Sequence, residues 1–202
     1  MQRREFLIAG AAVVTAALVS PCDLSMADPS ECISLPKPRM EGGKSLMSCL
    51  AGRRTNRSLS GEELDIQTFS DILWAAWGIN RDDGRHVIPT ARNRQQVGVY
   101  AVRGDGVWKY LPENHMVQKL IRADRRDRFD GSGLILLYAA PASDMFAGMH
   151  VGSMYQNVGL YCAQAGLANC VKYQRHDALD KELSMEDGWK VLITQSVGKS
   201  LV

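Results

Sequence analysis

The stretch Leu134-Ile135-Leu136-Leu137-Tyr138-Ala139-Ala140 decides the fold, because it is an unbroken apolar run. A run of this length is typical of a strand that is buried on both faces. The sequence therefore predicts a buried central strand over residues 134–140, around which the other elements pack.

A long helix is predicted after this strand, over residues 148–165, because the segment is apolar around much of its circumference. It contains small residues that would let another backbone approach closely: Gly152, Ser153, Gly159 and Ala163. Gly166 can end the helix in the left-handed conformation. Such a helix belongs in a core or at an interface between two copies of the chain.

A shorter helix is predicted to start near Leu64, because apolar residues follow a helical spacing there. They are Phe69, Ile72, Leu73, Ala76 and Trp77. Ser60 and Glu63 would form a capping box before the helix, and Gly78 would end it in the left-handed conformation.

The remaining elements are strands and helices without regular alternation. Residues 97–102 and 107–111 are predicted to form a hairpin, residues 177–185 a short helix and residues 190–197 a last strand. This order favours an α+β fold over a doubly wound sheet. No G-x-G-x-x-G follows a strand, so a Rossmann dinucleotide site is disfavoured.

Composition is that of one soluble globular domain, with 46% hydrophobic residues, 23% charged residues and a net charge of +2. Such a balance gives no reason to expect nucleic acid as a partner.

The N-terminus resembles a twin-arginine export signal, since Arg3-Arg4-Glu5-Phe6-Leu7 leads into an apolar run over residues 7–19. A run of about 13 residues is short of the ~20 that span a bilayer, which disfavours an uncut anchor. Cleavage fits after Ala27, and a lipoprotein ending at Cys22 is the minor alternative. The chain then divides into a signal peptide (1–27), a linker or extended arm (28–45) and a domain (46–202), exported or periplasmic and without stable membrane insertion.

Twin-arginine export carries folded proteins, so a tightly bound cofactor is expected. Four cysteines would remain after cleavage, and no CxxC or other metal-ligand spacing appears. Cys162 and Cys170 are expected to be buried thiols, whereas a bridge between Cys32 and Cys49 stays open.

Three polar or small-residue segments attract attention: Arg-Arg-Thr-Asn-Arg at 53–57, Pro-Thr-Ala-Arg-Asn-Arg-Gln at 89–95, and the exit of the long helix at 165–171. Each segment alone has an ordinary explanation. The first could be a solvated basic cluster, the second a loop whose side chains form hydrogen bonds with its own backbone, and the third a helix end.

Taken in this order, the segments resemble the nitroreductase family of FMN enzymes. The resemblance runs from about residue 46 to 199 and includes the helix end Leu73-Trp74-Ala75-Ala76-Trp77-Gly78 and the ending Val197-Gly198-Lys199. The stretch Val107-Trp108-Lys109-Tyr110 looks like the SagB-type branch. The resemblance implies a central, mainly antiparallel sheet flanked by helices, and a homodimer with FMN at the interface between its subunits.

The resemblance also implies which residues bind FMN. Arg53 and Arg54 would act as charge-assisted donors to the phosphate, with Thr55 as a hydroxyl donor and Lys199 as a second phosphate contact. Arg57 would reach the pyrimidine edge of the flavin, where positive charge stabilises the reduced anion.

The loop residues would bond the ring and the ribityl chain. They are Thr90, Ala91, Asn93 and Gln95. Asn169 and Cys170 depart from the family's pattern beside the ring and are left without a role.

The implied function is an FMN-dependent oxidoreductase that reduces a nitro- or quinone-like small molecule, or oxidises an organic substrate as SagB-type members do. No catalytic side chain is assigned, because the flavin carries the chemistry. The histidines are expected to be surface or structural residues: His86, His115, His150 and His176. The electron donor is unidentified, since NAD(P)H is not expected outside the cytoplasm. The alternative is a non-catalytic FMN-binding or redox-carrier protein.

Overall fold

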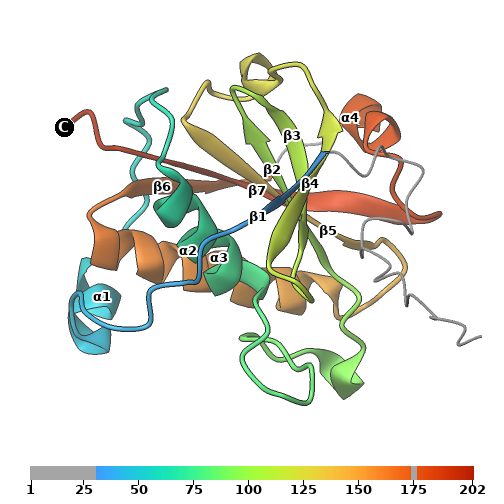
Figure 1. The fold of residues 1–202 in the computed structure, drawn as a ribbon, viewed down its shortest axis with the longest axis horizontal. Helices are drawn as coiled ribbons and strands as arrows, with labels where there is room; N and C mark the ends of the chain where they lie inside the picture. The colour runs from blue at the N-terminus through green and yellow to red at the C-terminus, as the bar shows by residue number, and fades with distance from the viewer. Residues whose placement is uncertain (1–30, 174–176) are drawn as a thin grey trace, which may run out of the picture.

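The computed structural model describes residues 31–173 and 177–202. They contain a seven-stranded sheet in the order β1-β4-β3-β2-β5-β7-β6, in which all neighbouring strands are antiparallel (Figure 1). The strands are β1 (Cys32–Ser34), β2 (Gly98–Arg103), β3 (Gly106–Leu111), β4 (Met116–Ile121), β5 (Leu134–Pro141), β6 (Ala168–Lys172) and β7 (Trp189–Gly198). The helices are α1 (Leu46–Gly52), α2 (Ile66–Trp77), α3 (Ala147–Ala165) and α4 (Asp177–Glu182), with 3-10 turns at Ala91–Asn93 and Arg126–Arg128. The predicted α+β fold with an antiparallel sheet and flanking helices is confirmed.

Strand β5 is the predicted central strand, and it pairs with β2 on one side and β7 on the other. Its side chains alternate between two hydrophobic clusters, so Leu136 and Tyr138 face one side of the sheet while Ile135 and Leu137 face the other. Each of these side chains is fully enclosed. Burying a side chain of this size stabilises a fold by roughly 1.5–3 kcal/mol, which explains why this run organises the domain.

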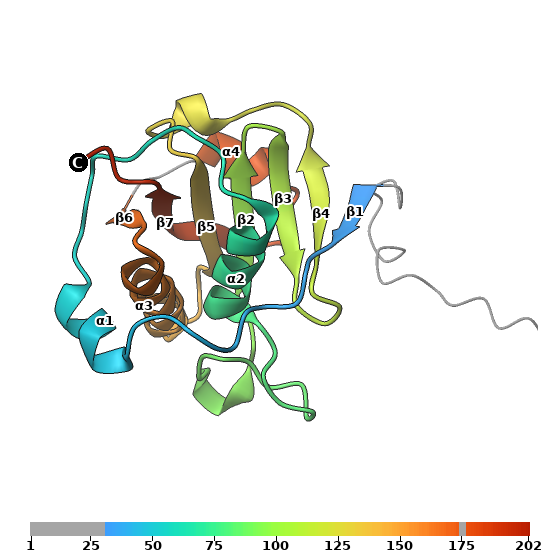
Figure 2. The same cartoon turned by 60° about the vertical axis from the view of Figure 1, so that its left-hand side comes forward.

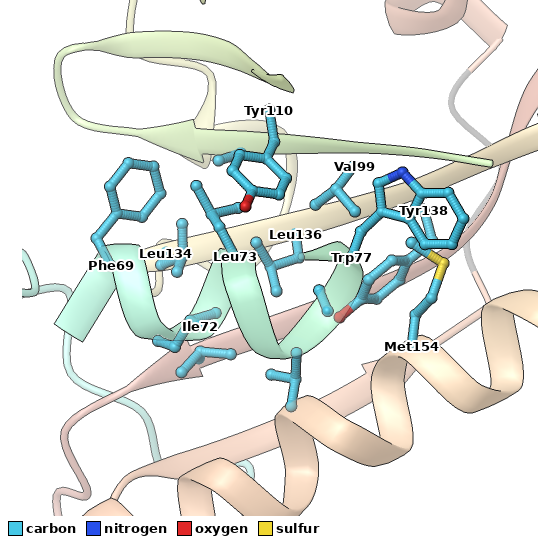
Figure 3. Packing of buried hydrophobic residues seen from close by; sticks show 14 of the residues in the cluster. Phe69, Ile72, Leu73, Trp77, Val99, Tyr110, Leu134, Leu136, Tyr138 and Met154 are labelled. Atoms are coloured by element: carbon cyan, nitrogen blue, oxygen red, sulfur yellow. The ribbon is translucent and has the colours of Figure 1, made fainter. Parts of the chain in front are cut away.

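Helices α2 and α3 cover one face of the sheet and α4 covers the other (Figure 2). Figure 3 shows Leu73 of α2 near Leu136, and Trp77 of α2 near Tyr138 and Met154 of α3. Phe69 belongs to the same cluster and lies at the other end of α2. Helix α1 packs against α3 at the edge of this layer.

The beginning of α2 differs from the predicted capping box. Asp65 caps the helix, because its carboxylate accepts a hydrogen bond from the Thr68 amide at 2.9 Å. Glu63 is engaged elsewhere, where its carboxylate accepts from the Gly104 amide at 2.7 Å and from Arg103 at 2.8 Å. Glu63 therefore holds the β2–β3 hairpin instead of capping α2.

The two helix-ending glycines act in different ways. Gly166 adopts φ 71° after α3, as predicted. Gly78 has φ −68° and ψ 155°, so the predicted left-handed end is wrong there. A Cβ atom at Gly78 would lie 2.2 Å from Cδ1 of Trp74, which shows that glycine is required at this position for space.

Residues 31–45 form an extended arm along the domain. β1 adds a strand beside β4, and the hydroxyl of Ser70 donates to the Pro36 carbonyl at 2.6 Å. Arg39 donates from its backbone N–H and from Nε to the buried carboxylate of Asp71, at 2.9 and 2.7 Å.

Of the cysteines that the structure describes, three are free and buried, namely Cys49, Cys162 and Cys170. Cys32 is disulfide-bonded, so the Cys32–Cys49 bridge is not formed. In the part of the chain that the structure describes, no helix combines the length and apolarity needed to cross a bilayer. The expected signal peptide over 1–27 lies outside the described residues.

Candidate functional site

The basic segment, residues 53–57, lies beside the C-terminal end of the chain. The Asn56 amide donates to the Asn169 carbonyl at 2.9 Å, and the Ser60 amide donates to the Lys199 carbonyl at 2.9 Å. An isolated bridge joins Leu59 to Ser200. The fold thus brings Lys199 next to the predicted phosphate-binding segment, although about 140 residues separate them in the sequence.

Arg53 and Arg54 border a polar cavity of about 300 Å³ between α1, α3 and the C-terminal segment. Other polar residues that line it are Lys44, Ser48, Asn56, Asn169 and Ser200. Thr55 and Arg57 are exposed in the same segment but do not line the cavity. The lining is therefore rich in hydrogen-bond donors and carries positive charge.

The charge of this segment is not neutralised by ion pairs with the described residues. Among the described residues, Arg53, Arg54 and Arg57 form no ion pair with a carboxylate, whereas arginines such as Arg39 and Arg103 do. Unpaired guanidinium groups around a polar cavity suit a phosphate, which accepts several charge-assisted hydrogen bonds. The residues present therefore fit the phosphate of FMN.

Lys199 is placed less freely than the arginines. Its Nζ atom donates to Oε2 of Glu62 at 2.5 Å, and this hydrogen bond lowers the pKa of Glu62. Both side chains are largely exposed, and exposed ion pairs contribute little. Lys199 can therefore reach an anion only by leaving Glu62.

The amide-bearing loop, residues 90–95, lies at the other end of α3. Thr90, Asn93 and Gln95 line a separate hollow of about 330 Å³. The Gln95 amide donates to Oγ1 of Thr90 at 3.2 Å, and Nε2 of Gln95 donates to Oδ1 of Asn93 at 3.2 Å. Ala91 does not line the hollow, because its N–H donates to Nε2 of His150 at 2.8 Å.

The backbone of this loop is strained. Arg92, Asn93 and Gln95 have φ values of 54°, 52° and 54°, in the left-handed region. Such conformations cost on the order of 1 kcal/mol each for residues with a side chain, and they tend to occur at functional sites.

Within one copy, the basic segment and the loop do not meet. The Arg53 side chain packs beside Gly159 of α3, where a built Cβ would lie 3.5 Å from Cδ of Arg53. The loop is bonded to His150, nine residues earlier. Nine residues correspond to roughly 14 Å along a helix and to about half a turn around it. The two groups of predicted site residues thus lie on opposite flanks of α3.

A buried network supports the basic segment from behind. Tyr138 donates to Oε1 of Gln195 at 2.6 Å, and Nε2 of Gln195 donates to Oδ1 of Asn169 at 3.1 Å. The Asn169 carbonyl then holds Asn56. Asn169, which has no role in the sequence-based prediction, therefore positions the segment from the sheet.

The described histidines are structural. His86 is buried and stacks on Trp77 at 3.6 Å between ring centroids, and His115 is hydrogen-bonded to Tyr110 at 2.8 Å. Burial lowers the pKa of both. His150 is buried under the loop, and His176 lies outside the described residues. Within the described ranges, no group of three or more His, Cys, Asp or Glu residues is arranged to hold a metal ion.

Sequence reasoning missed several residues that the fold brings to the site. Lys44 and Ser48 line the polar cavity from the arm and α1, and Ser200 lines it from the C-terminal segment. Each is a single polar residue in its own segment, so no local pattern identifies it. His150 is equally isolated in an apolar helix.

These features define an α+β protein with an antiparallel sheet, an unpaired basic segment and a strained polar loop near opposite ends of one helix. The sequence model of the nitroreductase family matches residues 50–199, and the chain belongs to this family.

Three relatives illustrate the match. A candidate nitroreductase of Methanocaldococcus jannaschii is 30% identical over 82 residues, which cover 38% of this chain and 41% of that protein. The crystal structure of a candidate nitroreductase from Ralstonia eutropha has a TM-score of 0.78 and 27% identity, and the match covers 85% of this chain and 90% of that chain. A nitroreductase with bound FMN from Bacteroides fragilis has a TM-score of 0.56 and 13% identity, with 78% of this chain and 89% of that chain covered. At that identity the last likeness shows the fold alone.

Proposed function

We propose that this chain is an FMN-dependent oxidoreductase whose flavin site is shared by two copies of the chain. The observation that carries the proposal is a segment of three arginines that have no carboxylate partner in residues 31–173 and 177–202; two of them border a polar cavity. Membership of the nitroreductase family and the bound FMN of the Bacteroides fragilis relative support it. When bound, FMN supplies hydride and electron transfer between a donor and an acceptor.

In this proposal each residue has a distinct task. Arg53 and Arg54 bind the phosphate, Thr55 adds a hydroxyl donor, and Lys199 joins them after leaving Glu62. Arg57 places positive charge at the pyrimidine edge of the ring.

The loop of the second copy contributes the polar groups for the ring and the ribityl chain. Thr90, Asn93 and Gln95 offer side chains, whereas Ala91 offers only its carbonyl and methyl group, since its N–H is bonded to His150. The basic segment and the loop lie on opposite flanks of α3, so one FMN cannot easily contact both within one copy. A site between two copies lets one FMN contact the basic segment of one copy and the loop of the other.

The molecule exposes large apolar side chains on α1 and around the start of α3, which suits contact with a second copy. These side chains are 45–83% exposed: Leu46, Met47 and Leu50 of α1, Met149 of α3, and Met145 just before α3. Exposed apolar side chains are typical of interaction surfaces where they form a patch. A two-fold axis at this surface would bring α3 of one copy against that of the other.

The substrate is proposed to be a nitro- or quinone-like acceptor, or an organic molecule that is oxidised as in the SagB-type branch. Only five residues separate β5 from α3, which leaves no room there for a roofing helix. We propose export through the twin-arginine pathway to the periplasm, with a quinol or a redox protein as electron donor.

The experiment is to express the chain with its signal, record the visible spectrum and test donors and acceptors. Yellow protein that reduces a nitroaromatic supports an enzyme, whereas yellow protein without turnover supports the non-catalytic FMN-binding or redox-carrier alternative. A colourless protein that ignores added FMN overturns both.

Charge reversal tests the residues themselves. Arg53→Glu and Arg57→Glu are expected to weaken FMN binding by about 10- to 100-fold each, as expected for lost charge-assisted bonds. The control is Lys190→Glu, which also replaces a positive charge by a negative one. Lys190 lies at the start of β7, whereas the basic segment lies beside the end of β7, so this variant is expected to leave FMN occupancy unchanged. Unchanged flavin occupancy in both arginine variants would sink the proposal.

A further inference from the structure

The buried pair formed by His150 and Asp144 lies directly beneath the strained loop. We propose that His150, oriented by Asp144, is a positioning residue that holds residues 90–95 in the shape that contacts the flavin. The link to the flavin rests on the proposed function, whereas the anchoring of the loop is independent of it.

The hydrogen bond from the loop fixes the tautomer of His150. The Ala91 backbone N–H can only donate, so Nε2 of His150, 2.8 Å away, must carry a lone pair. The ring proton of the neutral imidazole is therefore on Nδ1. His150 is 2% exposed, so water does not compete for this bond.

The protonated nitrogen faces Asp144. Nδ1 of His150 and Oδ2 of Asp144 are 3.9 Å apart, and both atoms are enclosed with no other hydrogen-bond partner in the described residues. Buried polar atoms are nearly always paired, so a movement of roughly 1 Å that closes this bond satisfies both at once. Asp144 thereby orients the imidazole toward Ala91.

The other oxygen of Asp144 is tied to both neighbouring segments. Oδ1 accepts from the Phe146 amide at 3.0 Å, at the start of α3, and from Nη1 of Arg94 at 3.3 Å. The loop is thus anchored at Ala91 through His150 and at Arg94 through Asp144. These two anchors bracket Arg92 and Asn93, which have positive φ values.

The two anchors can hold the loop in a conformation that would be unstable without them. Left-handed residues with side chains persist only where the surrounding structure holds them. Loss of the Ala91 anchor should let the loop relax and move the side chains of Asn93 and Gln95, which line the hollow.

Hydrogen exchange of the Ala91 amide in the full chain without flavin tests the anchor. His150→Gln keeps an acceptor at the end of the side chain, and His150→Leu removes it while keeping an apolar volume. We expect exchange at Ala91 to be at least about 10-fold faster in His150→Leu and within about 3-fold of the wild type in His150→Gln.

Exchange of the β5 amides reports global stability and separates a local effect from general unfolding. If His150→Leu does not fold, His150→Phe, which also removes the acceptor but keeps a ring, carries the same test. Wild-type exchange at Ala91 in a folded variant without the acceptor would overturn the anchor.

FMN affinity tests the positioning role. We expect His150→Leu to bind FMN at least about 10-fold more weakly, with recovery in His150→Gln. Faster exchange with unchanged FMN affinity would overturn the positioning role alone. A wild-type chain that binds no FMN would overturn the proposed function while the exchange data still decide the anchor.

Discussion

The hydroxyl of Tyr138 donates a hydrogen bond to Oε1 of Gln195, 2.6 Å away, between the central strands β5 and β7. Both side chains are completely buried. Burial raises the pKa of Tyr138 well above its usual value, so the hydroxyl stays a neutral donor wherever the protein is folded. Through Gln195 and Asn169 this bond connects the centre of the sheet to the basic segment.

Removal of this hydroxyl should destabilise the fold. Tyr138→Phe leaves Oε1 of Gln195 buried without a partner, and we expect the free energy of unfolding to fall by about 1–3 kcal/mol in urea denaturation. Tyr155→Phe is the matched control, since its hydroxyl makes no hydrogen bond with the described residues, and it should change stability by less than about 0.5 kcal/mol. Equal stability of Tyr138→Phe and the wild type would contradict the role of this bond.

Asp130 should make the protein sensitive to acid. Burial alone would raise the pKa of Asp130, but hydrogen bonds from Lys172, Ser132 and Ser196 lower it to about 2. The unfolded value is near 3.9, so the stabilisation is complete above about pH 4 and is lost as the pH falls toward 2. Between about pH 5 and pH 2.5, the wild type should therefore lose roughly 1–2 kcal/mol more stability than Asp130→Asn.

Urea denaturation at each pH measures this difference. Asp82 is an exposed carboxylate without an ion pair in the described residues, so Asp82→Asn should follow the wild-type curve. Parallel curves for Asp130→Asn and the wild type would show that Asp130 has no such role.

The pair between Lys199 and Glu62 should compete with flavin binding. An exposed ion pair is weak and is easily broken, so Glu62→Gln should free Lys199 and tighten FMN binding by roughly 2- to 5-fold. Lys199→Gln should weaken binding, and the double variant should resemble Lys199→Gln. Fluorescence titration with FMN measures all three, and a Glu62→Gln chain that binds FMN more weakly would argue against a phosphate contact by Lys199.

If the chain forms the proposed dimer, a charge on the apolar surface should separate the two copies. Met149 is 67% exposed on α3, and we expect Met149→Lys to weaken the dimer by at least about 10-fold and to reduce flavin occupancy in parallel. Light scattering after size exclusion measures the mass, and the visible spectrum measures the flavin. Ile33→Lys changes an exposed apolar residue on β1, at the far edge of the sheet, and should alter neither. A flavin-loaded monomer in either variant would rule out a shared site.

The sequence predicted the elements whose patterns are self-contained. The run at 134–140 is apolar throughout, and the hairpin of β2 and β3 has its turn in Gly104-Asp105-Gly106, so both could be placed without knowledge of their neighbours. Gly166 could also be predicted as the end of α3, because glycine adopts the left-handed backbone found there without steric cost.

Other elements depend on partners that are distant in the sequence. β1 has three residues and is a strand only because β4 lies beside it, and β4 carries the polar pair Gln118 and Lys119 in its middle. Helix α1 has a single buried residue, Cys49, so its apolar residues gave no inward-facing pattern.

The same limit applies to the candidate site. The basic segment and the loop could be selected from their motifs, but their positions on opposite flanks of α3 follow from packing against Gly159 and His150. Asn169 supports the basic segment and Asp144 helps to anchor the loop through tertiary contacts. These contacts could not be predicted from the spacing of residues in the sequence.

The three-residue strand β1 has a consequence for how the N-terminus can be trimmed. It pairs with β4 along Met116, Val117 and Gln118, and so covers backbone groups that would otherwise form a bare sheet edge. Proteolysis that removed Cys32–Ser34 would uncover a template for intermolecular strand pairing and so promote aggregation. A mature chain that starts at residue 28 keeps this protection, whereas one shortened by another seven residues would not.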